Sequence, residues 1–282
     1  TPSIRKHGFR VSFKAKYGAS KLNFPLYPGT KVETFDDLTL FPGGHDGCAF
    51  NTDIPQNNSW PYGQATYARA RWLFQSQIDT GNPGVHGDFV QVYINGLYWG
   101  LYRMNESPGA GYAADYFGGK KEDYDAIKHH SAVGSVGQPN QYEVIDGDNV
   151  AWLAMYAIAA AGVSTETQYQ AIRQYLDVEG FCDYLIVNMV SGNRDWPDKN
   201  WYANRRRVPG AGFKFYCWDG EITLGLEDPN ADRTGVNGAN SPGYIYSRLR
   251  ANTEFRRLFG DRVQKHLFNG GALTVANMQA RY

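Results

Sequence analysis

Apolar and polar residues alternate in the first part of the chain, and this pattern predicts β-strands. From Phe9 to Lys14 every second residue is apolar, the period of a half-buried strand with one cationic face. A short strand is also predicted at Leu38 to Phe41. The clearest pattern lies at residues 88–102, where two aromatic and β-branched runs flank Asn95-Gly96, a strong hairpin signal. The first hundred residues therefore predict a β-rich region.

Helical periodicity appears once in this region and then dominates the second half. Residues 64–78 carry apolar side chains at helical spacing, and Gly81 follows as a stop. The turn-rich residues 107–111 mark the best boundary in the chain. Beyond them, capping signals and periodicity predict helices at 149–162, 166–175, 178–190 and, with breaks, 244–267. Two strands, at 200–204 and 212–219, are embedded among these helices, so we expect an α+β fold.

The charge total conceals an uneven distribution along the chain. The 282 residues include 28 Lys and Arg and 28 Asp and Glu, a balance that argues against a global grip on nucleic acid or an anionic membrane. Residues 1–31 nevertheless contain no acidic residue and seven basic ones: Arg5, Lys6, Arg10, Lys14, Lys16, Lys21 and Lys31. Any polyanionic ligand should therefore be held locally.

Composition excludes two other classes of protein. Aromatic residues make up 15% of the chain and the AVILMFWYC set 42%, which is too apolar for wholesale disorder. The longest apolar run, Val150 to Val163, is shorter than the ~20 residues that span a bilayer.

The chain starts without Met or a hydrophobic signal core, so we expect it to be a piece of a longer protein.

The densest group of polar residues follows the helix predicted at 178–190. Asp195 is followed five positions later by Asn200, and the next strand ends in Trp218-Asp219-Gly220. Phosphoryl transfer needs such residues, because one carboxylate orients the attacking hydroxyl while an amide oxygen and a second carboxylate hold Mg²⁺. The spacing mirrors the kinase loop HRDxxxxN and the DFG motif. The alternative is that these Asp, Pro and Asn residues only form turns between a helix and a strand.

With these motifs, the chain resembles the CotH-type kinase family, an atypical protein-kinase-like family named for a spore-coat protein. The resemblance rests on five stretches: KHGFRVSFKAKYG (6–18), DFVQVYINGLYWGLYRMNE (88–106), DYDAIK (123–128), GNRDWPDKNWYANR (192–205) and FYCWDGEITLG (215–225). It implies a divergent two-lobed kinase fold, with a β-rich N-lobe at 1–106 and a mainly helical C-lobe at 107–282, together forming one kinase-like domain. By the same resemblance Asp195 is catalytic, Asn200 and Asp219 are metal ligands, and Glu221 is a further ligand.

The resemblance also implies cofactors and partners. The expected cofactor is ATP with Mg²⁺ or Mn²⁺, and the expected acceptor is a Ser or Thr of a secreted, coat or surface protein. No nucleic-acid partner and no membrane span are expected, and the protein itself should be secreted or associated with a coat or cell surface.

The phosphate-binding side is less well defined than the catalytic loop. No GxGxxG motif occurs near the start, and helix 64–78 offers Arg69 and Arg71 where a Glu would pair a strand lysine. Lys6, Lys14 and Lys128 are the candidate nucleotide-binding cations. Glu106 lies where a hinge residue would meet adenine.

Two other functions compete with the kinase hypothesis. The missing Gly-rich loop and the missing helix acid favour a catalytically silent scaffold of an extracellular coat or matrix. The aromatic content and several acidic pairs are also compatible with a glycan-active protein, in which Asp195 and Asp219 would flank an aromatic cleft. His129 and His130 are expected to be surface residues, because adjacent side chains diverge and no carboxylate lies at ligand spacing.

Overall fold

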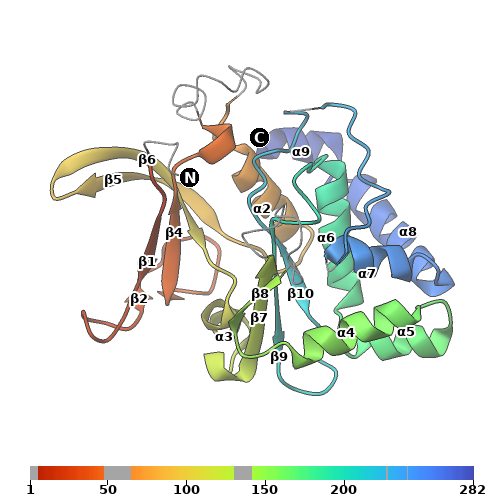
Figure 1. Cartoon of the computed structure of the whole chain (residues 1–282). Coiled ribbons are helices and arrows are strands. Elements are labelled where there is room, and N and C mark those ends of the chain that lie inside the picture. The colour runs from red at the N-terminus through yellow and green to blue at the C-terminus, as the bar shows by residue number, and fades with distance from the viewer. Residues whose placement is uncertain (1–5, 48–64, 130–141, 227, 240) are drawn as a thin grey trace.

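A computed structural model describes residues 6–47, 65–129, 142–226, 228–239 and 241–282, and it contains two four-stranded sheets with helices packed around the second (Figure 1). The first sheet has the order β1-β4-β6-β5 and is antiparallel throughout. Its strands are β1 (Phe9–Ser12), β4 (Asp37–Phe41), β5 (Gly87–Ile94) and β6 (Leu97–Glu106). A short ladder of β2 (Leu22–Asn23) and β3 (Thr34–Phe35) lies in the connection between β1 and β4, and the 3₁₀ turn η1 (Gly44–Asp46) follows β4.

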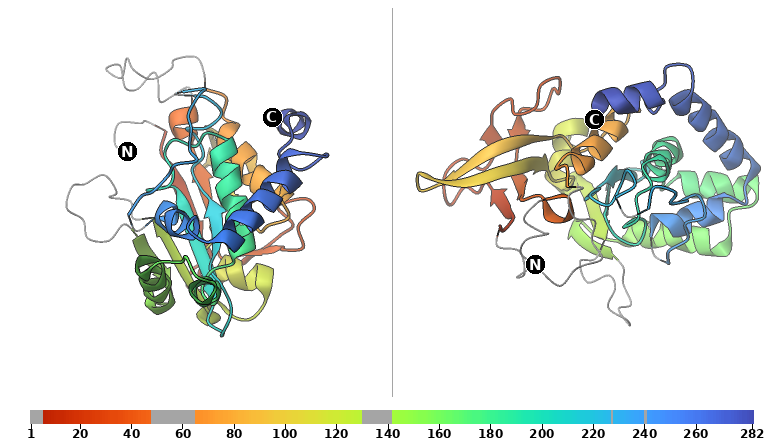
Figure 2. Two further views of the ribbon diagram at one scale, coloured as in Figure 1. Left: turned by 90° about the vertical axis from the view of Figure 1, so that its right-hand side faces the viewer. Right: turned by 90° about the horizontal axis from the view of Figure 1, so that it is seen from above.

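The predicted hairpin is confirmed as β5 and β6. Ile94 pairs with Leu97, and Asn95 and Gly96 adopt φ values of 50° and 82°. Two consecutive residues with positive φ form the turn that matches the right-handed twist of the strands. Figures 1 and 2 both show the far end of this hairpin projecting from the body.

The prediction for β1 is only partly confirmed. The strand forms and its polar face is solvent-accessible, but Val11 is 36% exposed instead of facing the interior. β1 is an edge strand that pairs only with β4, so fewer neighbours cover its apolar face.

The second sheet is larger than the sequence predicts. Its order is β10-β9-β7-β8, and it consists of β7 (Tyr124–His129), β8 (Tyr142–Asp146), β9 (Trp201–Arg206) and β10 (Lys214–Cys217). The pair β9–β10 is the one that the sequence predicts. β7 is missed because its first four residues are all buried, so no apolar–polar alternation marks it.

Helices cover this second sheet, and their ends follow the predicted capping signals. They are α2 (Arg69–Asp79), α3 (Ala110–Phe117), η2 (Lys121–Asp123), α4 (Val150–Ala161), α5 (Glu166–Arg173), α6 (Val178–Val190), α7 (Pro242–Leu249), α8 (Thr253–Leu267) and α9 (Val275–Arg281). Thr165 caps α5, Asp177 caps α6 and Asn252 caps α8 through side-chain hydrogen bonds. The helix predicted to start at residue 64 begins at Arg69, and residue 64 lies outside the described residues.

The main core lies between the second sheet and its helices. The rings of Trp152 on α4 and Trp201 on β9 stack at 5.4 Å, and both are fully buried. Gln77 on α2 donates to Phe215 O and accepts from Cys217 N, which fixes α2 against β10. Figure 2 shows the strands of the first sheet on one side of the molecule and α4, α5, α7 and α8 on the other. No helix in the described ranges is long and apolar enough to cross a membrane.

Candidate functional site

The loop between α6 and β9 is held by buried side chains. Asn193 donates to Asn188 Oδ1 on α6 at 2.9 Å, and Trp196, 1% exposed, donates through Nε1 to Tyr184 OH at 2.7 Å. Trp196 and Trp201, at the two ends of this stretch, are both buried packing residues. The loop therefore has a fixed shape before any ligand binds.

This loop brings three predicted site residues together. Asn200 adopts φ 65°, and its Nδ2 donates to Asp195 Oδ2 at 3.4 Å and to the backbone oxygen of Asp219 at 3.2 Å. Asp219 is also left-handed, with φ 49°. Because the nitrogen of the Asn200 amide makes both bonds, its oxygen Oδ1 is the atom available to a metal ion. Lys199 lies 2.9 Å from Asp195 Oδ1, so both carboxylate oxygens of Asp195 have a cationic or amide neighbour.

Backbone hydrogen bonds tie the turn after β10 to the same loop. Arg194 N donates to Ile222 O at 3.1 Å, and Leu224 N donates to Ser191 O at 2.8 Å. Gly220 lies against Leu73 of α2, where a Cβ atom would come within 2.3 Å of Leu73 Cδ2. Only glycine fits at that position. The turn after β10 therefore packs directly against helix α2.

Two carboxylates in this turn, those of the half-buried Asp219 and the buried Glu221, are incompletely paired. Asp219 Oδ1 and Glu221 Oε1 have no hydrogen-bond partner among the described residues. Glu221 Oε2 accepts from the backbone nitrogen of His45 at 2.7 Å and lies 3.3 Å from His45 Nδ1. Burial and the neighbouring charge of Glu221 raise the pKa of Asp219 to about 7. Burial is the largest single influence on His45 and disfavours its charged form, but the hydrogen bond to Glu221 and the charges of Glu221, Asp219 and Asp195 together outweigh it and raise the pKa of His45.

The oxygen atoms around this turn fit a divalent cation. Carboxylate and amide oxygens are the ligands that Mg²⁺ and Mn²⁺ prefer, and a bound cation would satisfy the carboxylate oxygens that have no partner. Among the described residues no group of three or more His, Cys, Asp or Glu side chains has the arrangement of a metal site. Asp219, Glu221 and Asn200 together supply two carboxylates and an amide, and such a set leaves the remaining positions to waters and ligand oxygens.

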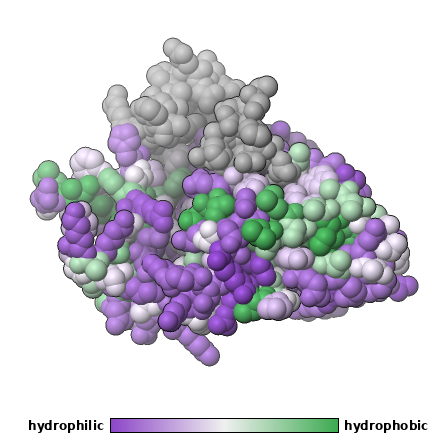
Figure 3. Space-filling model, turned by 60° about the horizontal axis from the view of Figure 1, so that its bottom comes forward, coloured by the Kyte–Doolittle hydropathy of each residue, from purple (hydrophilic) through white to green (hydrophobic). Residues whose placement is uncertain are grey.

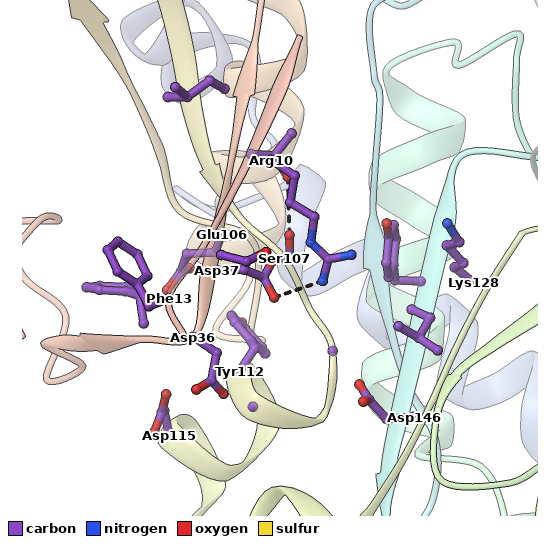
Figure 4. A pocket seen from close by; sticks show the side chains of 18 of the residues that line it. Arg10, Phe13, Asp36, Asp37, Glu106, Ser107, Tyr112, Asp115, Lys128 and Asp146 are labelled. Carbon is purple, nitrogen blue, oxygen red and sulfur yellow. Dashed lines mark hydrogen bonds and ion pairs between the residues drawn. The ribbon is translucent and has the colours of Figure 1, made fainter. Parts of the chain in front are cut away.

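A large cavity opens beside Asp219 and Glu221. Its volume is about 1590 Å³, and residues from β1, β4, β7, β8 and β9 line it together with Asp219 and Glu221. Figure 4 shows Arg10 and Asp37 on one wall, joined at 2.9 Å, and Lys128 and Asp146 on the opposite wall. Asp195 and Asn200 are not among the residues that line the cavity, but Asn200 is bonded to Asp219, which does line it. Figure 3 shows a face on which hydrophilic side chains dominate the left and the lower part, while hydrophobic patches run from the centre toward the right.

The four predicted nucleotide-binding residues, Lys6, Lys14, Glu106 and Lys128, all line this cavity. Lys6 donates to Leu101 O, lies 3.1 Å from Tyr67 OH, and has its pKa lowered by burial. Lys128 lies 3.2 Å from Glu143 Oε2.

Glu106 is 2% exposed and is engaged through both carboxylate oxygens. Oε2 accepts from His86 N at 2.8 Å and lies 2.9 Å from His86 Nδ1. Oε1 accepts from Tyr116 OH at 2.7 Å. Its carboxylate therefore braces the segment around residue 106 and is already occupied.

Helix α2 uses its first arginine in a buried ion pair. Arg69 is bonded to Asp46 of η1, and Asp46 also accepts from the backbone nitrogens of Arg69 and Thr66. The first basic residue of α2 therefore faces an acid from η1, the turn after β4. Arg71, by contrast, is half-exposed and lies 3.8 Å from Asp88.

Sequence reasoning missed four residues at this site. Arg103 is 2% exposed on β6, His45 contacts Glu221, and Lys199 contacts Asp195. Arg233, from the loop after the acidic turn, donates to the backbone oxygen of Trp196. Lys199 could have been found by its position four residues after Asp195, whereas no local pattern marks Arg103 or His45.

The surface position expected for His129 is only partly confirmed, because this side chain is half-buried. Burial lowers its pKa to about 4, and its ring lies against the backbone and ring of Trp201. His130 lies outside the described residues.

Comparison with known proteins includes a match to a family model. The model of the CotH kinase protein family matches residues 61–282, well over half of the chain. The match includes the 192–205 and 215–225 stretches and leaves out the basic strand at 6–18. None of the curated proteins matches the chain.

Proposed function

Because the chain belongs to the CotH kinase protein family, we propose that it is an atypical protein kinase that transfers the γ-phosphoryl group of ATP to a Ser or Thr hydroxyl. The observation that carries this proposal is the pair of hydrogen bonds through which Asn200 joins Asp195 to Asp219. Phosphoryl transfer depends on positioning and electrostatic stabilisation more than on covalent chemistry. A preformed Asp–Asn–Asp group supports such a reaction.

Each of these residues has a separate role in the proposal. Asp195 orients the acceptor hydroxyl and takes its proton as the new oxygen–phosphorus bond forms and the bond to the β-phosphate oxygen breaks. Asn200 through Oδ1, Asp219 and Glu221 would hold Mg²⁺ or Mn²⁺. When bound, the cation would neutralise charge on the β- and γ-phosphates.

The cavity offers the nucleotide a charged enclosure. Lys6, Lys14 and Lys128 line it and would face the phosphates, and the half-exposed ion pair of Lys128 with Glu143 is weak enough to exchange for a phosphate. The carboxylate of Glu106 is already bonded to His86 and Tyr116, so the backbone around residue 106, and not this side chain, would meet the adenine.

The proposed layout places a lobe boundary after Glu106. The first sheet ends at this residue and the second begins after it, which supports an N-lobe at 1–106 and a C-lobe at 107–282 within one kinase-like domain. The family name supports a coat protein as the acceptor, and we extend this to secreted and surface proteins.

The test is transfer of label from γ-labelled ATP with Mg²⁺ or Mn²⁺ to a generic acceptor such as casein. Asp195→Asn should lower the rate by a factor of about 10² to 10⁴, the usual contribution of a positioned base. Asp261→Asn, an exposed acid on α8, is the matched control and should retain the wild-type rate. Equal transfer by wild type and Asp195→Asn would remove Asp195 from the mechanism.

A silent scaffold is the second candidate, and two observations favour it. Lys199 already neutralises Asp195, and Lys6 is already bonded to Leu101 O. A scaffold would show no gain in stability with ATP and Mn²⁺, whereas a nucleotide-binding protein at 100 times its Kd gains about 2.7 kcal/mol.

A further inference from the structure

Arg233 reaches the proposed catalytic base from a different part of the chain. It lies in the loop between the acidic turn at residues 219–221 and α7, and its Nη2 donates to the backbone oxygen of Trp196. The same nitrogen lies 3.5 Å from the backbone oxygen of Arg194. Arg194 and Trp196 are the residues immediately before and after Asp195. A single guanidinium therefore contacts the chain on both sides of Asp195.

The backbone carbonyl of Trp196 depends on this contact. Trp196 is 1% exposed, and a buried carbonyl needs a hydrogen-bond donor. Within the described ranges, Arg233 is the only donor to Trp196 O. The next residue, Pro197, has no backbone N–H and cannot contribute a backbone hydrogen bond to this loop. A side chain from another segment therefore fixes the backbone here.

Two further contacts hold the loop of Arg233 along the loop of Asp195. Asp228 lies 3.8 Å from Nη1 of Arg194, but this ion pair is weak because both side chains are nearly half-exposed. Gly243, at the start of α7, lies so close to Pro197 that a Cβ atom would come within 2.6 Å of Pro197 Cγ. Between these two points, Arg233 provides the polar contacts to the backbone next to Asp195.

The side-chain contacts of Asp195 alone define its direction only loosely. Asn200 Nδ2 lies 3.4 Å from Oδ2, which is long for a hydrogen bond, and Lys199, the partner of Oδ1, is 43% exposed. The backbone of residues 194–196 therefore has to fix where the carboxylate points. A general base acts only within hydrogen-bond reach of the proton that it takes, so a shift of this backbone would slow the transfer.

We propose that Arg233 is a positioning residue for Asp195, because its guanidinium holds the backbone carbonyls on both sides of the base. This inference rests on the proposed kinase function. Arg233 is not among the residues that line the cavity, so it acts on the base and not on the nucleotide. The alignment of Asp195 thereby depends on a loop that follows the proposed metal ligands Asp219 and Glu221 in the chain.

Steady-state transfer of phosphate from ATP to casein tests this role. Arg233→Met should lower kcat about 10- to 100-fold, while the KM for ATP stays within about twofold of wild type. Arg233→Lys and Arg233→Gln both keep a donor for Trp196 O and should recover a large part of the lost kcat.

Arg256→Met is the matched control for these variants. Arg256 on α8 also donates to two backbone oxygens, those of Arg250 and Ala251, at 2.9 and 3.1 Å. Its loss removes the same kind of contact without touching the Asp195 loop, so kcat should not change.

Three kinetic results would overturn the proposal. An unchanged kcat in Arg233→Met would show that Asp195 is aligned without this residue. A higher KM for ATP with an unchanged kcat would assign Arg233 to the nucleotide. An equal loss of kcat in Arg256→Met, or no recovery in Arg233→Lys and Arg233→Gln, would show that the hydrogen bonds to the carbonyls are not the cause.

Amide hydrogen exchange tests the contact independently of phosphate transfer. In Arg233→Met, exchange should accelerate about fivefold at residues 192–199 as well as at 228–239, while α6 stays unchanged. Arg256→Met should leave both loops at wild-type rates. Acceleration confined to 228–239, or extending through α6, would overturn the proposal even if the wild-type protein transfers phosphate. If the wild type transfers none, the proposed kinase function fails, and exchange still decides whether Arg233 holds the Asp195 loop.

Discussion

The two sheets that border the cavity differ in how they are supported. The second sheet is packed against α4 and α6 through a large aromatic core that includes Trp152, Trp201 and Phe215. The first sheet rests on a separate small cluster of Tyr27, Val32, Phe35 and Leu38. Asp195, Asn200 and Asp219 are attached to the better-packed side, whereas Lys6 and Lys14 come from the other. The comparison indicates a rigid acidic half and a more adaptable cationic half.

The largest effect should come from the aromatic core. Trp152→Ala removes a fully buried side chain that contacts Trp201, Phe213 and Phe215, so we expect a loss of about 3–5 kcal/mol in the free energy of unfolding. Urea denaturation measures it. Leu153→Ala, on the same helix but 51% exposed, should cost under about 0.5 kcal/mol. Similar losses for the two variants would contradict the claim that the second sheet is the better-packed one.

His129 lies on β7 of the second sheet and makes the stability of the protein depend on pH. Its pKa is about 4 in the folded protein against 6.5 for free histidine, chiefly because of burial. The folded state disfavours protonation of His129. The contribution of His129 to the free energy of unfolding is therefore fully present above pH 6.5, and it is lost as the pH falls from 6.5 toward 4. A shift of this size corresponds to about 3 kcal/mol.

His129→Gln should flatten this part of the stability curve between pH 7 and 4.5, measured by urea unfolding at each pH. His7→Gln, at an exposed histidine, should retain the wild-type slope. If the His129 variant loses stability toward acid as steeply as wild type, other groups cause the decline.

The small cluster should show a smaller and more local effect. Leu38 is 3% exposed on β4, and Leu38→Ala should cost about 2–3 kcal/mol, the low end for a buried leucine, because a small cluster can relax around the gap. Amide hydrogen exchange should accelerate in β1 and β4 and stay unchanged in α6. Leu97→Ala, 69% exposed, is the control. Uniform acceleration across both sheets would show that they unfold as one unit.

The smallest effect is expected for an ion pair on the wall of the cavity. The Lys128–Glu143 ion pair has side chains 25% and 45% exposed, so a double-mutant cycle with Lys128→Met and Glu143→Gln should give a coupling of at most about 0.5 kcal/mol. A coupling above about 1 kcal/mol would mean that Lys128 is committed to structure instead of being available to a ligand.

Local signals explain most of the elements that the sequence predicts. Asn95-Gly96 marks the hairpin because few other residue pairs tolerate two positive φ values in succession. Capping residues such as Thr165 and Asp177 mark helix starts that the structure confirms. β7 was missed because a strand buried on both faces has no alternation to detect.

Local signals in the sequence also predict only part of the candidate site. The spacing of Asp195, Asn200 and Asp219 suggests that they converge, since each follows or precedes a strand at the same edge. The contacts of His45 and Arg103 depend on how α2 and the turn after β4 pack against the acidic turn, and nothing in their own neighbourhoods encodes this.

The most direct test of the central claim is the position of Mn²⁺ in crystals grown with a non-hydrolysable ATP analogue. Anomalous scattering locates the ion without reference to any assumed chemistry. The account predicts a Mn²⁺ peak at ligand distance, roughly 2.0–2.3 Å, from a carboxylate oxygen of Asp219 and from Asn200 Oδ1, with the phosphates in the cavity. A nucleotide bound with its metal away from both residues, or no ordered Mn²⁺ at this turn, would contradict it.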